Sequence, residues 1–183
     1  MKRILFLLAM ILIGVNVSFA SNKKEKKNAE NMALYEKAVK AVQDKKFVVK
    51  FHTDDGKSYK SDRNVRRRLN SLTNFLMVDG NTTFRQFDDG RRVLGHYHGC
   101  GVHIDYPEIK EGTVSEVNVN VDDKGKVTCT LLTKQEGKSD YVVEITFKKG
   151  SNECTIKGGR KGNKSTSWGT IHPIGETEIR KAI

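Results

Sequence analysis

Ten residues in the middle of the chain concentrate side chains that could do chemistry. The stretch HYHGCGVHID, residues 96–105, holds three of the five histidines, one of the three cysteines and a carboxylate. If the glycine and cysteine at its centre form a two-residue turn, His96, His98, His103 and Asp105 project from one face of the hairpin. Their nitrogen and oxygen atoms could then bind zinc, copper or nickel.

A second register removes that site. A three-residue loop at residues 99–101 would pair Tyr97 with His103 and move this histidine to the opposite face, which leaves only His96 and His98 together. The stretch is then a solvent-facing turn with Cys100 exposed at its tip. Such a thiol could join two copies by an intermolecular disulfide in an oxidising compartment. We expect no cofactor, and zinc or copper is the alternative that the first register would bring.

Arginines form the second candidate site. Four of them lie within residues 63–68, among them Arg66 and Arg68, and Arg85 follows with two more beyond it. A groove of guanidinium groups could grip phosphates or carboxylates, and the alternative is a solvated strand and turn. No nucleic-acid-binding module and no exposed aromatic series accompanies them, so we expect no specific nucleic-acid partner.

The single tryptophan, Trp168, could stack on a sugar or pack to close the fold. Together with Arg66 and Arg68 it completes the candidate ligand-binding residues. The chain has no Gly-x-Ser-x-Gly elbow and no phosphate loop. A cysteine nucleophile at Cys100 or a metal-dependent hydrolase stays open, but a base that is adjacent in sequence is not thereby placed correctly in space. We therefore expect a protein that is not an enzyme.

The N-terminus has the pattern of a secretory signal. Lys2 and Arg3 precede the apolar run ILFLLAMILIGV, and small residues stand at Ser18 and Ala20 before a polar segment. The run is short for a membrane span, and no cysteine follows for acylation. We expect residues 1–20 to be removed, and the mature chain to be periplasmic or secreted without a stable membrane anchor.

The mature chain of 163 residues would carry 31 basic and 22 acidic residues, a net charge of +9. Its length suits one domain with a real core. This net positive charge favours anionic partners such as phosphorylated glycans or lipid head groups. Alternatively, the charge serves only to keep the protein soluble. The partner we expect is an unknown small molecule or a component of the cell envelope.

The hydrophobic pattern divides the mature chain in two. Apolar residues at helical spacing predict an amphipathic helix at about residues 27–44, within a lysine-rich lead at 21–45. From residue 46 to 183 the period is two, with glycine-containing turns between the runs. About eight to ten short antiparallel strands that bury one face predict a barrel or a strongly curled sheet.

Two cysteines fall on the buried phase of this alternation. Cys129 lies in KVTCTLL and Cys154 in NECTIK, so both are expected in the core. A disulfide is the alternative, and the spacing alone leaves it open.

Two segments resemble a known family of exported bacterial proteins, domain of unknown function 4251. The segment LTNFLMVDGNTTFRQF resembles its Asn-Phe strand and Asp-Gly turn, at residues 74, 75, 79 and 80. The segment GGRKGNKSTSWGTIHPI resembles its closing hairpin, with Gly159, Arg160, Gly162, Ser167, Gly169 and Pro173 as the matching residues. The resemblance extends to KFVVKF and VNVNVDDKGKV, and so spans nearly the whole mature chain.

The resemblance implies a mainly β fold, an N-terminal helix followed by an antiparallel β-barrel of lipocalin-like topology. It implies no reaction. The chain departs from the family at HYHGCGVHID, where relatives tend to show tyrosine and glycine, so the resemblance lends no support to a histidine site. We expect a non-catalytic exported module that binds a small hydrophobic or glycan-like ligand in the barrel mouth. The alternatives are a metal-binding protein and an envelope protein that binds anionic polymers.

Overall fold

The computed structural model describes residues 2–54, 67–87, 108–134, 140–160 and 163–182, with side chains from residue 23 onward except at positions 67, 108 and 163. The elements are helix α1 (Lys2–Gln43) and strands β1 (Lys46–Asp54), β2 (Arg67–Arg68), β3 (Phe75–Asp79), β4 (Thr82–Phe87), β5 (Glu108–Val121), β6 (Val127–Lys134), β7 (Tyr141–Phe147), β8 (Glu153–Arg160) and β9 (Asn163–Pro173).

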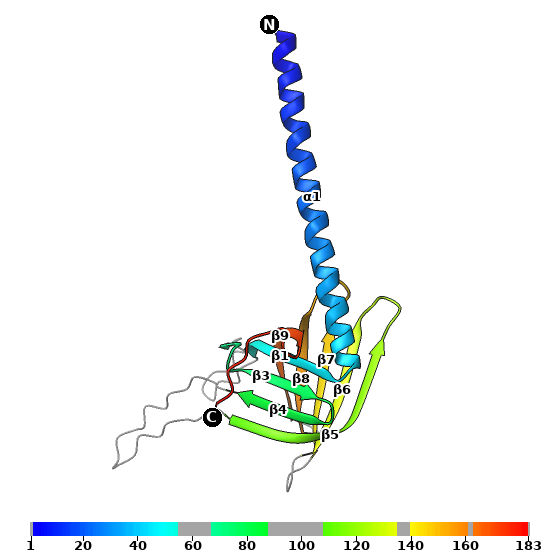
Figure 1. Cartoon of the computed structure of the whole chain (residues 1–183), viewed down its shortest axis with the longest axis vertical. Coiled ribbons are helices and arrows are strands. Elements are labelled where there is room, and N and C mark those ends of the chain that lie inside the picture. The colour runs from blue at the N-terminus through cyan, green and yellow to red at the C-terminus, as the bar shows by residue number, and fades with distance from the viewer. Residues whose placement is uncertain (1, 55–66, 88–107, 135–139, 161–162, 183) are drawn as a thin grey trace, which may run out of the picture.

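Eight of these strands form a closed antiparallel barrel (Figure 1). Strand β1 pairs with β3, each following strand pairs with the next, and β9 returns to pair with β1. The two-residue β2 adds to the outer part of β1, where Thr53 pairs with Arg68. The expected fold, an N-terminal helix followed by a lipocalin-like barrel, is confirmed.

The two ends of the barrel differ. At the helix end, α1 lies over the barrel together with the turns that join β3 to β4, β5 to β6 and β7 to β8 (Figure 1). At the opposite end, which we call the mouth, β1, β4, β6 and β8 finish. The segments that follow these four strands, beginning at residues 55, 88, 135 and 161, lie outside the described residues.

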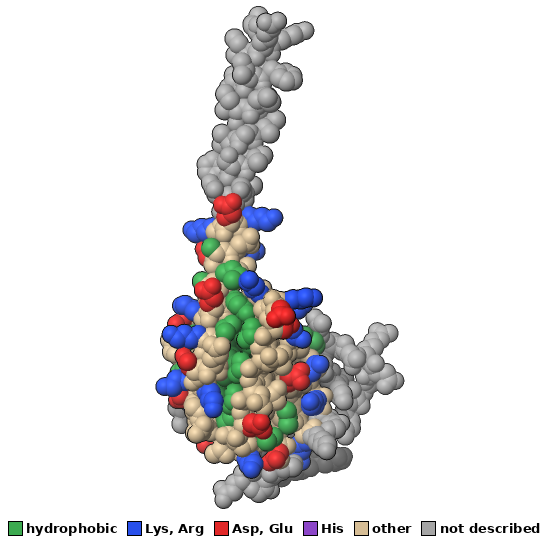
Figure 2. All heavy atoms as spheres, turned by 90° about the vertical axis from the view of Figure 1, so that its right-hand side faces the viewer, with side chains coloured by type: hydrophobic (Ala, Val, Ile, Leu, Met, Phe, Trp, Pro, Cys, Tyr) green, Lys and Arg blue, Asp and Glu red, His purple; other side chains and the backbone are tan. Residues whose placement is uncertain are grey.

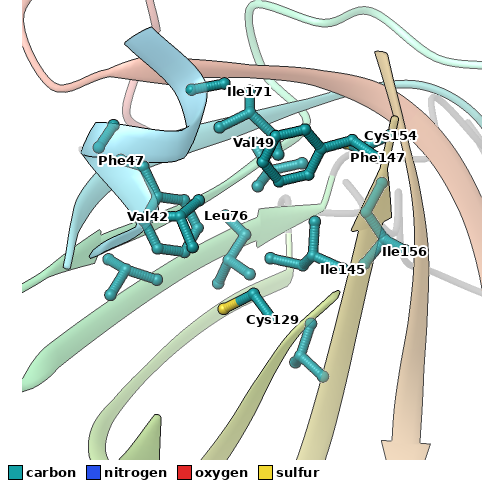
Figure 3. Close-up of a cluster of buried hydrophobic side chains, with 14 of the residues drawn as sticks. Val42, Phe47, Val49, Leu76, Cys129, Ile145, Phe147, Cys154, Ile156 and Ile171 are labelled. Atoms are coloured by element: carbon teal, nitrogen blue, oxygen red, sulfur yellow. The ribbon is translucent and has the colours of Figure 1, made fainter. Parts of the chain in front are cut away.

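The alternation in the sequence predicted the inward face correctly. Val119 on β5 pairs with Cys129 on β6, and Cys129 pairs with Ile145 on β7. On β8, Ile156 pairs with Ile145 and continues the row. Figure 3 shows the side chains of Cys129, Ile145 and Ile156 together below the end of α1. Side chains two apart on a strand share a face, so one pattern places every strand's apolar residues inside.

The helix closes its end of the barrel with its last turns. Tyr35, Ala38 and Val42 are buried in the core. The Tyr35 hydroxyl donates a hydrogen bond to the carbonyl of Gly125 at 2.9 Å, and its ring meets Phe147 edge-on at 6.0 Å between centroids. The helix ends at residue 43, close to the predicted 44, but it begins at residue 2 instead of 27. The intervening segment contains no proline, so every residue of it can donate to the backbone ladder.

No helix in the described part of the chain is both long and apolar enough to cross a membrane.

One stretch of the wall is less covered than the rest. Beyond Thr113, strand β5 pairs with β6 but with no other described strand. Val117 and Val119 are therefore only partly buried, and Val121 is 44% exposed. Figure 2, which views the side on which β5 rises in Figure 1, shows hydrophobic side chains at the surface below α1.

The C-terminal segment after β9 crosses the outside of β3 and β4. Gln86, which points outward from β4, donates hydrogen bonds to the carbonyls of Thr73 and Arg180 and accepts one from the Ala182 amide. It is only 1% exposed as a result. The ammonium of Lys181 lies 4.9 Å from the centre of the Phe84 ring. This segment explains why outward-facing residues of these two strands are buried.

Both core cysteines are confirmed as buried free thiols. Burial raises the pKa of Cys129 to about 12 and raises that of Cys154 as well. Because the thiolate is the reactive form, we expect neither to react with a maleimide in the native protein at neutral pH. Mass spectrometry of labelled peptides checks this. Both peptides should be modified only in denaturant, and native labelling of either at the rate of a free peptide thiol would contradict the burial.

Candidate ligand-binding groove

The predicted metal site cannot be placed in this structure. His96, His98, His103 and Asp105 lie outside the described residues, as do Cys100 and Arg66. Within the described ranges, no three histidine, cysteine, aspartate or glutamate side chains are grouped so that they could hold a metal ion. The histidine site therefore stays a prediction.

The structure brings two predicted ligand-binding residues into one row on the outer wall. Thr53 on β1 pairs with Arg68 on β2 and, across its other edge, with Trp168 on β9. Trp168 in turn pairs with Thr155 on β8, which pairs with Thr146 on β7. Directly paired side chains project to the same face. At the usual strand spacing, Arg68 and Trp168 are about 10 Å apart along this row.

Trp168 does not close the barrel. Its ring is partly exposed, and it is absent from the core cluster, whose β9 member is Ile171. Trp168 therefore lies on the outer wall of the barrel, and its role in binding stays a prediction.

A β-bulge aims a histidine toward the same wall. Phe51 pairs with Gly169 and Thr53 with Trp168, so His52 is an extra residue in β1. Phe51 remains in the core while His52 is exposed. Bulges redirect side chains in this way and increase the local twist. Gly169 permits the close approach of the two strands, because a Cβ at that position would overlap the carbonyl oxygen of Lys50.

These residues border a groove of about 490 Å³ on the outside of the barrel. Its walls include His52, Glu153, Thr155, Trp168 and Thr170. The volume falls within the range of small-molecule sites. The groove offers one aromatic face together with hydroxyl, imidazole and carboxylate groups, which can both donate and accept hydrogen bonds.

Two histidines share one hydroxyl at the edge of this groove. The Nε2 atoms of His52 and His172 lie 3.0 and 2.9 Å from the Thr170 Oγ1. A threonine hydroxyl has one proton to donate, so at least one of the two rings must donate to it. Sequence analysis missed this pair, because the two histidines are 120 positions apart and meet only through the β1–β9 pairing.

The neutral imidazoles are favoured in this arrangement. Partial burial lowers the pKa of His52, and Lys50 lowers it further while Glu153 opposes the shift. Burial also lowers the pKa of His172, with contributions in the same direction from Lys50 and His52 and an opposing one from Glu176.

We therefore expect the stability of the folded protein to fall at acidic pH, because His52 and His172 are protonated more readily in the unfolded chain. The unfolded chain takes up protons at its ordinary histidine pKa of about 6.5, before the folded chain does, so stability falls as the pH drops below that value. We expect the double variant His52→Gln/His172→Gln to lose less melting temperature between pH 7.5 and 5 than the parent protein. Thermal unfolding at both values measures the difference. Equal losses would contradict lowered pKa values at these residues.

Of the arginines in the predicted groove, Arg68 and Arg85 have described side chains, and these two lie on different surfaces of the barrel. Arg68 is exposed on β2 beside the outer row. Arg85 pairs with the core residue Leu76 and lines the barrel interior, so it belongs to a different surface.

The interior has little room. Among the described residues it holds a cavity of about 20 Å³ toward the mouth, comparable with the roughly 30 Å³ that one water molecule takes up in the liquid. Barrels of eight strands can be filled by their own side chains, and this one is. The described interior offers no space for a hydrophobic ligand of lipid size.

The chain thus belongs to the class of closed eight-stranded antiparallel barrels with an N-terminal helix at one end. Among solved structures it is similar to a DUF4251 family protein from Bacteroides eggerthii, with a TM-score of 0.62 and 21% sequence identity over 82% of this chain and 94% of that chain. At this identity the match shows a shared fold, and it confirms the fold that the sequence resemblance implied. Neither a protein-family model nor a curated protein matches the sequence.

Proposed function

We propose that this chain is an exported, non-catalytic binding module that holds an acidic oligosaccharide on its outer wall. The observation that carries the proposal is the row Arg68, Thr53, Trp168, Thr155, which runs across four strands beside the 490 Å³ groove. An indole face packs against the apolar side of a sugar ring, and threonine hydroxyls suit its hydroxyl groups. The guanidinium of Arg68 suits a carboxylate or phosphate substituent.

Two features favour this groove over the other large one. The second groove, of about 580 Å³, lies beside α1 and is lined by Lys37, Lys40, Asp79 and Glu176 among others. The ion pair between Lys37 and Glu176, at 2.8 Å, already joins its two sides. Its described lining also contains no aromatic ring. The export signal and the positive charge of the mature chain agree with an anionic envelope partner.

The single tryptophan gives this proposal a direct test. Because Trp168 is the only tryptophan, fluorescence excited selectively at tryptophan reports on this groove. We would titrate an oligogalacturonate and a neutral oligosaccharide of the same length. The expected result is a saturable change in emission that is stronger with the acidic sugar.

Calorimetry on variants distinguishes the contribution of ring stacking to sugar binding from the contribution of charge. Trp168→Ala should weaken binding of the acidic sugar at least about tenfold, equivalent to 1.4 kcal/mol. Arg68→Gln should remove the preference for the acidic sugar over the neutral one. Thr155→Val tests a hydroxyl in the groove, and Thr130→Val is its control on the outer face of β6. Binding that survives Trp168→Ala unchanged would refute the proposal.

A further inference from the structure

Arg85 is a cation on the inner face of the barrel. It pairs with the core residue Leu76, and it lines the small interior cavity with Phe51, Tyr141 and Ser167. Arginine is seldom found in such a position without a partner of opposite charge.

The contacts of Arg85 hold the guanidinium without neutralising it. Nη1 donates a hydrogen bond to the Tyr141 hydroxyl at 2.8 Å. The guanidinium carbon lies 5.4 Å from the centre of the Tyr141 ring and 5.6 Å from that of Phe87. No carboxylate in the described ranges forms an ion pair with it, although Asp54 is buried at the same end of the barrel. Among the described residues, the Tyr141 hydroxyl is the acceptor for one of the five N–H donors of Arg85.

The surroundings keep this arrangement in place. A Cβ on Gly158 would lie 2.7 Å from the Tyr141 hydroxyl oxygen, so the glycine leaves the space that this side chain occupies. Ser165 and Ser167, both small, line the cavity from β9. The result is a cavity of about 20 Å³ whose lining includes the side chains of both Arg85 and Ser167.

We propose that this cavity binds a monoanion the size of a chloride ion or of a single carboxylate group, held by Arg85 and the hydroxyl of Ser167. The site is separate from the outer groove and does not depend on the proposed function. The anion supplies the negative charge that the described side chains do not, and it links β4 to β7 and β9. A free halide and a small free carboxylate such as formate share this chemistry.

Thermal unfolding of the mature protein tests the site. Melting temperatures would be measured in sodium chloride, sodium formate and sodium gluconate at equal ionic strength, because gluconate is too large for the cavity. We expect chloride or formate to raise the melting temperature relative to gluconate, saturably, by about 3–6 °C at ten times the Kd. A shift with chloride indicates a halide site, and a shift with formate alone indicates a carboxylate.

The variant Arg85→Met should abolish this anion-specific shift. Lys157→Met, on the exposed face of β8, removes the same charge from the surface and should keep the shift. If Arg85→Met does not fold, Tyr141→Phe serves, since loss of the hydroxyl that orients the guanidinium should reduce the shift. Equal melting temperatures of the parent protein in all three salts, or the same shift in the Arg85 variant, would overturn the proposal.

Discussion

Gly169→Ala is expected to destabilise the barrel by about 3 kcal/mol or more, among the largest effects of a single methyl group. A Cβ at this position would lie 2.9 Å from the Lys50 carbonyl carbon and 3.3 Å from the Phe51 Cα, and would overlap the Lys50 oxygen. All three atoms are backbone, so no side-chain rotation can relieve the overlap. The strands β1 and β9 would have to separate at the bulge.

Urea denaturation followed by circular dichroism measures this effect as a lower midpoint. Lys164→Ala is the control, because it truncates an exposed side chain on the same strand and should change stability by much less. A Gly169→Ala protein with the parent's midpoint would show that the two strands are not so close in solution. The same variant should also lose the groove, because the bulge that exposes His52 directly follows the pairing of Phe51 with Gly169.

Phe147→Ala should cost about 3–5 kcal/mol, the usual range for removing a large aromatic side chain from a core. Phe147 is 2% exposed and pairs with Val127 on β6 and Cys154 on β8. Its ring also meets Tyr35, so the substitution removes a contact between the helix and the barrel together with the core packing. We therefore expect α1 to dock more weakly.

Urea denaturation gives the free energy of unfolding, and near-ultraviolet circular dichroism follows the environment of Tyr35. Phe147→Leu retains most of the volume and should cost far less. A double-mutant cycle with Tyr35→Leu isolates the ring contact, expected at about 0.5–1.5 kcal/mol. A loss below 1 kcal/mol for Phe147→Ala would contradict the packing below α1.

The sequence predicted those features that depend on neighbours along the chain. Alternation identified Cys129 and Cys154 as core residues, and their burial confirms it. The turn glycines Gly80 and Gly125 have φ angles of 59° and 73°, the left-handed conformation that their turns require. Burial on a single face is a periodic property, so it can be read from spacing without knowing which strands meet.

Charged residues on the inward phase were harder to interpret. The sequence grouped Arg85 with Arg68, although one lies inside the barrel and the other outside. The strand register places Arg85 inward beside Leu76, although a charged side chain is typical of the surface. Only the rings of Phe87 and Tyr141 and the hydroxyl of the latter show how the guanidinium is accommodated inside.

The sequence by itself thus determined the strand pattern and the core face, because these follow from local period and turn chemistry. The tertiary structure decided which distant residues share a surface. His52 lies near His172, and Arg68 lies in one row with Trp168, because β9 pairs with β1 through a bulge. Gln86 is buried because the C-terminal segment crosses over it. Registers between distant strands depend on the packing of the whole barrel, and no local pattern encodes them.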